Sequence, residues 1–301
     1  MKPDYDCVTD TIDILGEGPV WSEAAQALHW VDIRGHKFRR MSPGAAVETW
    51  PMPDMVASFA LHSDGRVLMA MRQSLVAFHP ATGALETMFR LDVDDPDRRF
   101  NEGKCDRSGR FLVGTMSDRT RLTSGVVSNA DAEGAGVLYR FDAGYECERL
   151  FGDIHIPNCL AWSPDGRLMY FADTARGAIY RYRYDADSGA LGPRELFATT
   201  STKPGRPDGG TVDAEGFLWC TDYGGWTITR YDPNGRIERI VTLPVEQPTS
   251  CAFGGANLDI LYVTTAAQRL SPEQLARQPH AGKVLALDTG ARGLPEPLFE
   301  G

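Results

Sequence analysis

The chain alternates between short apolar runs and polar turns over most of its length. The clearest example lies within residues 154–174, where an apolar segment, the turn Ser163–Gly166 and a second apolar run, Leu168–Ala172, follow one another. The glycine after Asp165 supplies the positive φ that tight hairpin turns often require. This pattern predicts a β-hairpin in the middle of the chain.

Six segments share this strand–turn–strand character, and each is followed by a third strand and a more variable fourth. In chain order they begin at Val20, Phe59, Lys104, Leu160, Thr211 and Cys251. Their second strands are predicted to end near Asp32, Met71, Thr115, Asp173, Asp222 and Thr265. The repeat of about 40 to 60 residues is typical of four-stranded propeller blades. We therefore predict an all-β, six-bladed β-propeller formed by residues 1–301 as a single domain.

A β-sandwich with similar turns is the alternative fold, but a sandwich does not predict six repeats of one order. Two local predictions accompany the propeller. The segment CVTDTIDIL, residues 7–15, should pair onto the last sheet and so remove an exposed edge. The stretch SPEQLARQ should form a short helix, with Ser271 as its N-cap and Glu273 in its first turn.

One position of each repeat falls at the mouth of the predicted inner strand, eight residues before the turn glycine where that glycine is present. In chain order this position holds Glu17, Ala57, Asn101, Asn158, Asp208 and Ser250. Inner strands of a propeller surround its axis, so these mostly oxygen-bearing side chains should converge. Oxygen ligands without thiolates are those that a hard divalent cation prefers. We predict a central axial metal site; the alternative is that these residues satisfy strand ends or line a water-filled channel.

Charge and cysteine usage narrow the classes of partner. The formal net charge of −10 disfavours nucleic acid and anionic membranes, because both would be repelled. The six cysteines are scattered without a CxxC motif, which favours a reducing compartment over a disulfide framework. The first ten residues lack the apolar region of a secretory signal, and no apolar run is long enough to span a membrane. We expect a cytoplasmic protein; the oligomeric state stays open, and a monomer is compatible with the sequence.

Several motifs resemble the SMP-30/gluconolactonase family, also called regucalcin-like. They are LGEGPVW (Leu15–Trp21), RRFNEGKCDRSGRFLVGTM (Arg98–Met116), IPNCLAWSPDG (Ile156–Gly166), RPDGGTVDAEGFLW (Arg206–Trp219), LPVEQPTSCAFGG (Leu243–Gly255) and the segment Leu261–Leu287. The resemblance covers nearly the whole chain in order. It implies a six-bladed propeller that binds one divalent metal on its axis and hydrolyses sugar lactones.

The resemblance also implies roles for individual residues. Glu17 of GEGP, Asn158 of IPN and Asp208 of PDG match the family's metal ligands. Arg99 matches a substrate-binding arginine, and Asn101 matches an asparagine that contacts substrate or water. These matches coincide with the column of residues that the repeats identify.

At some positions this chain departs from the family's motifs, and these departures affect the prediction of its substrate. Family members place a substrate-binding glutamate in the loop after the third repeat's Gly-Thr-Met, where this chain offers Asp118 and Glu133; we take Glu133 as the candidate. Many members have Asn-Gly where this chain has Asn158-Cys159, and Asn-Asp where it has Asn101-Glu102. The first departure changes backbone freedom beside a predicted ligand.

We therefore expect metal-dependent hydrolysis of a sugar aldonolactone, a pentono- or hexonolactone, to the aldonic acid. Asp208 is the candidate general base, and the cation could be Ca²⁺, Zn²⁺, Mn²⁺ or Fe²⁺. One alternative is an organophosphate, aryl-ester or lipophilic-lactone hydrolase on a related propeller; the polar loop at residues 117–135 favours a sugar. Another alternative is a non-catalytic, metal-binding propeller.

Overall fold

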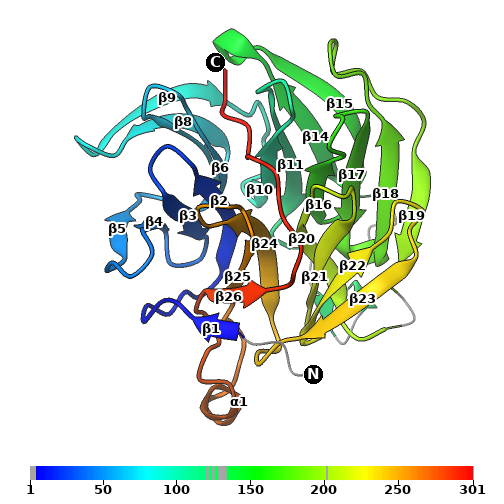
Figure 1. The fold of residues 1–301 in the computed structure, drawn as a ribbon. Helices are drawn as coiled ribbons and strands as arrows, with labels where there is room; N and C mark the ends of the chain where they lie inside the picture. Colours follow the sequence, from blue (N-terminus) through cyan, green and yellow to red (C-terminus); the bar gives the residue numbers. More distant parts are fainter. Residues whose placement is uncertain (1–4, 120–121, 124–125, 128–133, 201–202, 301) are drawn as a thin grey trace. The chain divides into compact units, whose positions relative to one another are not determined.

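Antiparallel β-sheet dominates the structure, in the order that the repeats predict (Figure 1). The computed structural model describes residues 5–119, 122–123, 126–127, 134–200 and 203–300. Within these ranges the strands form six four-stranded sheets and one two-stranded hairpin. The six sheets are the blades of a six-bladed β-propeller, so the predicted fold class is confirmed.

Five sheets are built from four strands that follow one another along the chain. The first sheet comprises β2 (Gly16–Ser22), β3 (Ala27–Asp32), β4 (Lys37–Met41) and β5 (Glu48–Pro51). The second comprises β6 (Val56–Leu61), β7 (Val67–Met71), β8 (Ser74–His79) and β9 (Ala84–Arg90). The third comprises β10 (Arg98–Cys105), β11 (Phe111–Ser117), β14 (Gly136–Phe141) and β15 (Cys147–Ile154). Between its second and third strands lies the hairpin of β12 (Leu122–Thr123) and β13 (Val126–Val127).

The remaining sheets follow the same plan until the last one. The fourth comprises β16 (Pro157–Trp162), β17 (Leu168–Asp173), β18 (Ala178–Arg183) and β19 (Glu195–Thr199). The fifth comprises β20 (Arg206–Val212), β21 (Leu218–Tyr223), β22 (Thr227–Tyr231) and β23 (Ile237–Thr242). The sixth comprises β24 (Pro248–Gly254), β25 (Ile260–Thr265), β26 (Leu285–Asp288) and β1 (Tyr5–Cys7).

The contacts divide the chain into two units of three sheets each. The first unit, Met1–Met55 with Thr200–Glu296, contains the first, fifth and sixth sheets. The second unit, Val56–Thr199 with Pro297–Gly301, contains the second, third and fourth sheets. Within each unit the first strands of neighbouring sheets pack together: β2 and β20 both contact β24, and β6 and β16 both contact β10.

The N-terminal segment completes the sixth sheet, as predicted, although the strand lies earlier than expected (Figure 1). β1 pairs with β26 through Tyr5 opposite Leu287 and Cys7 opposite Leu285, whereas residues 7–15 had been expected to form the strand. Beyond Cys7 the chain keeps isolated contacts beside this sheet: the Val8 N–H donates to the carbonyl oxygen of Val284 at 3.0 Å, and Leu15 forms a single bridge with Ala266. Between these contacts the buried Asp13 carboxylate accepts hydrogen bonds from Trp30 Nε1 at 2.8 Å and Arg39 Nε at 2.7 Å.

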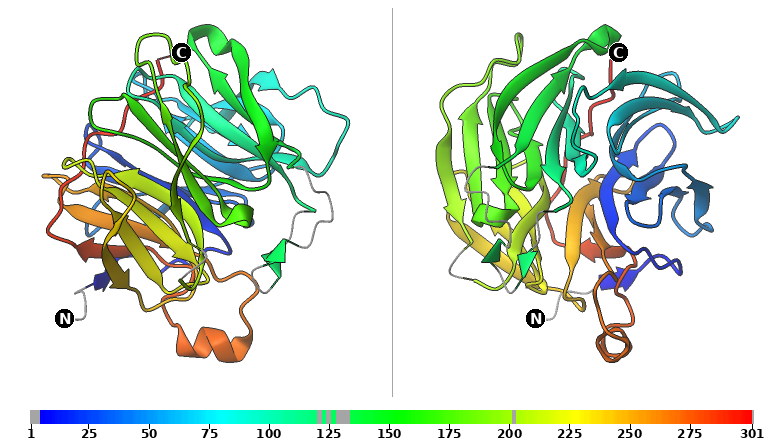
Figure 2. Two further views of the ribbon diagram at one scale, coloured as in Figure 1. Left: turned by 90° about the vertical axis from the view of Figure 1, so that its right-hand side faces the viewer. Right: turned by 180° about the vertical axis from the view of Figure 1, so that it is seen from behind.

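The predicted helix is present as α1 (Pro272–Arg277), in the connection between β25 and β26 (Figure 2). Ser271 caps it: its Oγ accepts the Gln274 N–H, and the Gln274 side chain accepts the Ser271 N–H. This reciprocal capping box satisfies two backbone donors at the helix start. Glu273 lies in the first turn, as predicted. No helix in the described ranges is both long and apolar enough to cross a membrane.

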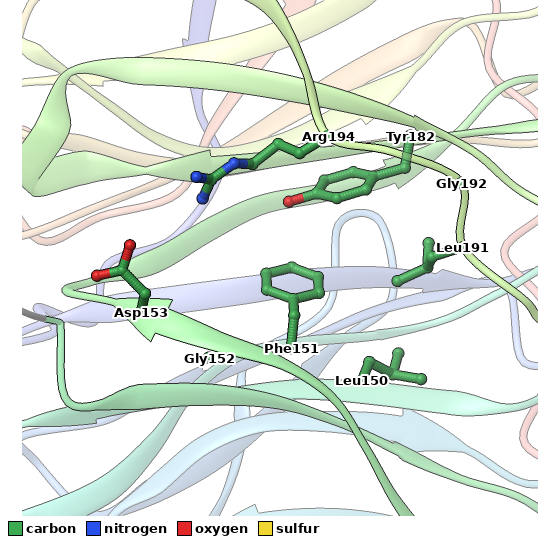
Figure 3. Close-up of a pocket in the computed structure, with 8 residues that line it drawn as sticks. All are labelled: Leu150, Phe151, Gly152, Asp153, Tyr182, Leu191, Gly192 and Arg194. Atoms are coloured by element: carbon green, nitrogen blue, oxygen red, sulfur yellow. The ribbon is translucent and has the colours of Figure 1, made fainter.

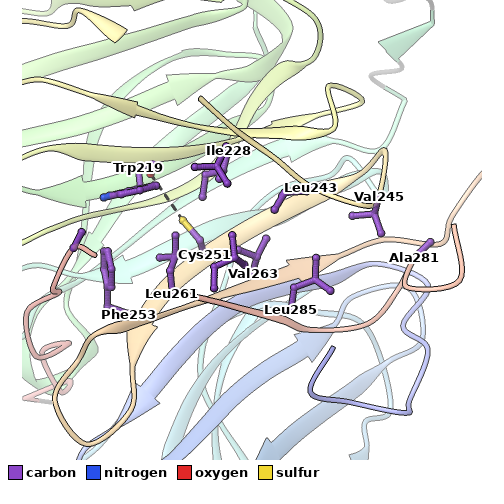
Figure 4. Packing of buried hydrophobic residues seen from close by; sticks show 13 residues of the cluster. Trp219, Ile228, Leu243, Val245, Cys251, Phe253, Leu261, Val263, Ala281 and Leu285 are labelled. Atoms are coloured by element: carbon purple, nitrogen blue, oxygen red, sulfur yellow. Dashed lines mark hydrogen bonds between the residues drawn. The ribbon is translucent and has the colours of Figure 1, made fainter. Parts of the chain in front are cut away.

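The second strand of each sheet is almost wholly buried, whereas the fourth strand is largely exposed in most sheets, and this contrast explains the sequence pattern. All residues of β24 are buried, whereas five of the six residues of β23 are exposed. Side chains of the fifth and sixth sheets form one apolar core in the first unit (Figure 4). There Trp219 and Phe253 meet edge to face at 6.1 Å, next to the buried Cys251. Strands buried on both faces read as continuous apolar runs, as the sequence shows.

Burial of His29 on β3 makes the free energy of unfolding depend on pH. Its ring is buried and stacks on Phe38 at 5.9 Å. Burial, reinforced by the positive charge of Arg40, lowers the pKa of His29 to about 4. Between pH 4 and 6.5 the unfolded chain therefore binds more protons at this residue, so the free energy of unfolding should rise with pH over that window. The expected gain is up to about 3 kcal/mol, fully present above pH 6.5.

Denaturant unfolding at pH 4.5 and pH 7 measures this effect. His29→Gln should flatten the difference between the two pH values, because the amide does not titrate. His79→Gln, at the end of β8, serves as the matched histidine control and should keep the wild-type difference. An unchanged pH dependence in His29→Gln would refute the assignment.

Candidate functional site

Each of the six first strands in the described chain departs from regular pairing beside the predicted site position. The register shifts lie between Glu17 and Val20, Val56 and Ser58, Phe100 and Gly103, Asn158 and Ala161, Pro207 and Gly210, and Pro248 and Ser250. Such bulges bend a strand, redirect its side chains and are over-represented next to active sites. The repeated position found in the sequence therefore corresponds to a repeated backbone feature.

The bulge of the sixth repeat is one residue shorter than those at Asn101, Asn158 and Asp208. Ser250 keeps regular pairing with Thr264, and the residue left out of the ladder is Thr249. Thr249 Oγ1 donates to the carbonyl oxygen of Gly16 at 2.5 Å and so joins β24 to β2. The Ser250 side chain instead packs on Gly209, where an added Cβ would lie 2.1 Å from Ser250 Oγ. Glycine is therefore required directly after Asp208.

The first unit carries two of the predicted metal ligands, Glu17 on β2 and Asp208 on β20. Both are buried, each with 7% of its surface exposed. Both carboxylates affect Tyr223, which lies at the end of β21. Burial raises the pKa of Tyr223 to about 12, and the negative charges of Asp208 and Glu17 contribute to this increase. The Tyr223 hydroxyl accepts a hydrogen bond from Gln268 Nε2 at 3.2 Å. Two buried carboxylates thus act on one phenol within this unit.

The second unit carries the other predicted residues in a continuous hydrogen-bond chain. On β10, Arg99 Nη1 donates to Asn101 Oδ1 at 2.7 Å. Asn101 Nδ2 donates to the carbonyl oxygen of Pro157 at 2.9 Å and lies 3.3 Å from Asn158 Oδ1. Asn158, on β16, donates through Nδ2 to Thr174 Oγ1 at 2.7 Å. The structure therefore brings together Asn101 and Asn158, which the repeats select, and Arg99, which the resemblance adds.

Two further residues belong to this network: Asp118, which the sequence offered beside Glu133 as a substrate-binding acid, and Thr174, which it did not single out. Asp118, just after β11, accepts a hydrogen bond from Arg99 Nε at 2.5 Å and lies 3.8 Å from Arg72. Asp118 therefore holds the arginine that the resemblance assigns to substrate. Thr174 directly follows β17 and receives the Asn158 amide. Glu133, the substrate-binding candidate, lies outside the described residues.

Cys159 occupies the position where many family members have glycine. Its φ is +50° and its side chain is fully buried. The left-handed conformation costs an L-residue about 1–2 kcal/mol relative to the right-handed region. In the first sheet, Gly18 adopts a similar φ of +55° directly after Glu17. The chain thus keeps the turn beside Asn158 even though the side chain there is not glycine.

The described residues contain no cluster of three or more His, Cys, Asp or Glu side chains arranged to hold a metal ion. The predicted ligand set has a different composition, because one of its three members is an asparagine. The structure describes Glu17 and Asp208 within the first unit and Asn158 within the second.

A pocket of about 380 Å³ lies in the second unit, between side chains of the third and fourth sheets (Figure 3). It contains none of the predicted site residues. Phe151 and Tyr182 stack at 5.2 Å along its wall. At its rim Asp153 pairs with Arg176 at 2.7 Å, and the Arg194 guanidinium lies over the Tyr180 ring at 5.0 Å. These polar groups are engaged within the protein, so the pocket offers little to orient a ligand.

Fold and site together define a six-bladed β-propeller whose first strands are bulged and carry buried oxygen-bearing side chains. The chain belongs to the SMP-30/gluconolactonase/LRE-like family, whose model matches residues 15–267. This confirms the resemblance recognised from the motifs.

Relatives extend over the whole chain. It is 34% identical over 306 residues to 6-deoxy-6-sulfogluconolactonase of Pseudomonas putida, covering 100% of both proteins. It is 35% identical over 297 residues to L-arabinolactonase of Azospirillum brasilense, covering 98% of this chain and 95% of that protein. The crystal structure of the calcium-binding protein regucalcin from Agrobacterium tumefaciens superposes with a TM-score of 0.91 at 29% identity, covering 100% of this chain and 99% of the other.

Proposed function

We propose that this protein hydrolyses a sugar aldonolactone, a pentono- or hexonolactone, to the corresponding aldonic acid. The observation that carries the proposal is full-length similarity, at 34% and 35% identity, to two proteins named for sugar lactones. The family model's match to residues 15–267 supports the same proposal.

The residues present fit a divalent cation by their chemistry. Glu17, Asp208 and Asn158 offer oxygen donors, and all three are at least 93% buried. Hard cations prefer carboxylate and amide oxygens of this kind. When bound, the cation would polarise the lactone carbonyl and lower the pKa of a nearby water. The solved relative described as calcium-binding supports Ca²⁺; Mn²⁺, Zn²⁺ and Fe²⁺ suit the same oxygen ligands.

The protein's own groups then have distinct tasks. Asp208 accepts the proton of the attacking water as the water oxygen bonds to the carbonyl carbon. The ring C–O bond then breaks, and the ring oxygen leaves as a hydroxyl after taking from Asp208 the proton that came from the water. Arg99 and Asn101 orient the lactone carbonyl and the sugar hydroxyls, and Glu133 contributes a further substrate contact. The substrate therefore binds through polar groups rather than through an apolar wall.

A pH-indicator assay tests this function against its alternatives. Acid release should be fastest with a pentono- or hexonolactone, and slow with an aryl ester, a lipophilic lactone or a phosphotriester. A preference for one of the latter would support the esterase alternative. A protein that binds metal but opens none of these substrates would instead be a non-catalytic propeller.

A further inference from the structure

We propose that Thr174 is a positioning residue for the metal site: by accepting the Asn158 amide N–H, it leaves Asn158 Oδ1 as the ligand atom. This inference rests on the proposed function and assigns a role to a residue that the sequence motifs did not single out. Thr174 and Asn158 are both buried, each with 3% of its surface exposed. The bond between them, from Nδ2 to Oγ1, is 2.7 Å long.

The direction of the whole hydrogen-bond chain is set at its other end. A guanidinium only donates, so the group that Arg99 Nη1 contacts must be the oxygen of the Asn101 amide. The Asn101 nitrogen then faces the carbonyl oxygen of Pro157 and the Asn158 amide, which must turn its oxygen toward that donor. Asn158 Nδ2 consequently points to Thr174. Asp118, bound to Arg99 Nε, anchors the first member of the chain.

Thr174 is held firmly enough to act as an anchor. It begins the 3-10 turn Thr174–Arg176, and its backbone N–H donates to the carbonyl oxygen of Ile156 at 3.0 Å. The Asp173 carboxylate accepts the backbone N–H groups of His155, Ile156 and Ala175 at 3.0–3.2 Å. The segment before Asn158 and the turn that carries Thr174 are therefore tied to one buried carboxylate.

The orientation of the amide matters because only one end of it can bind a cation. The amide oxygen has lone pairs, whereas the amide nitrogen presents only donors. Without an acceptor at position 174, Nδ2 would be buried without its partner, and the amide would no longer be held with its oxygen as ligand. Loss of such outer partners typically lowers metal affinity about 10- to 100-fold.

The test is a Mn²⁺ titration of metal-free protein, with free Mn²⁺ measured by electron paramagnetic resonance. Thr174→Val keeps the shape but removes the acceptor, and should raise the Mn²⁺ Kd about 10- to 100-fold. Thr174→Ser keeps the hydroxyl and should stay within about threefold of wild type. With an aldonolactone, the Mn²⁺ concentration for half-activation should rise in Thr174→Val, while kcat at saturating Mn²⁺ stays near the wild-type value.

Thr229→Val is the matched control, because Thr229 Oγ1 is equally buried and donates to Asp222 at 2.7 Å in the fifth sheet. It should leave the Mn²⁺ Kd unchanged. An unchanged Kd in folded Thr174→Val, or in Thr174→Ala if the valine variant does not fold, overturns the inference. So does a wild-type protein that binds no Mn²⁺. Wild-type protein that binds Mn²⁺ but opens no lactone overturns the proposed function alone, since the Kd comparison still decides the role of Thr174.

Discussion

Asp208→Asn should lower kcat for lactone opening about 10²- to 10⁴-fold at saturating metal, because the amide cannot accept the proton of the attacking water. The same change should weaken metal binding, since it removes one of the buried carboxylate charges. The variant keeps an oxygen of nearly the same size beside Gly209, so the packing against Ser250 is preserved. Metal titration and steady-state kinetics on one aldonolactone measure the two effects separately.

Glu17→Gln is the matched control for this prediction. It removes the other buried carboxylate charge but leaves the proposed base in place. It should therefore weaken metal binding while kcat recovers at saturating metal. Full kcat in metal-saturated Asp208→Asn would exclude Asp208 as the base, and Glu17 would then be the first residue to test for that role.

The architecture could be predicted because its signal is periodic and local. The predicted ends of the second strands at Asp32, Met71, Asp173 and Thr265 coincide with the ends of β3, β7, β17 and β25. Each of these strands is buried and follows a polar turn. Because a buried strand needs apolar residues, the strand appears in the sequence as an apolar run after a polar segment. The N-terminal strand was placed too late: β1 ends at Cys7, and within residues 8–15 only Leu15 makes a bridge, with Ala266, as the segment passes the buried Asp13–Arg39 pair.

The site could be predicted only as far as spacing along the chain determines it. Counting from the turn reaches Asn101 and Asn158, because each bulge lies at nearly the same distance from its turn. Thr174 was missed, and the contact of Asp118 with Arg99 was not predicted, because these contacts depend on side-chain direction across a bulged register. Pairing of Arg98 with Ser117 brings Asp118 near Arg99. Spacing along the chain does not determine, however, which carboxylate accepts the hydrogen bond from the Arg99 guanidinium.

The same limit explains the sixth repeat. Spacing selects Ser250, whereas the unpaired residue is its neighbour Thr249, because this bulge is one residue shorter than those at Asn101, Asn158 and Asp208. A shift of one residue along a strand moves a side chain to the opposite face. A role can therefore be assigned to a residue at a bulge only when the register of the two strands is known from the structure.

Removing the divalent cation with a strong chelator should lower lactone hydrolysis at least about 100-fold, because polarisation of the carbonyl by a metal contributes several kcal/mol. Activity should return on adding back Ca²⁺, Mn²⁺ or Zn²⁺, and the ranking of these ions identifies the preferred one. Removal should also lower the temperature of unfolding, since a ligand bound only by the folded state stabilises it. Chelator presaturated with Ca²⁺ controls for inhibition by the chelator itself. Full turnover in protein shown by mass spectrometry to be free of metal would contradict the proposed mechanism, and lactone opening would then have to rely on Asp208, Arg99 and Asn101 alone.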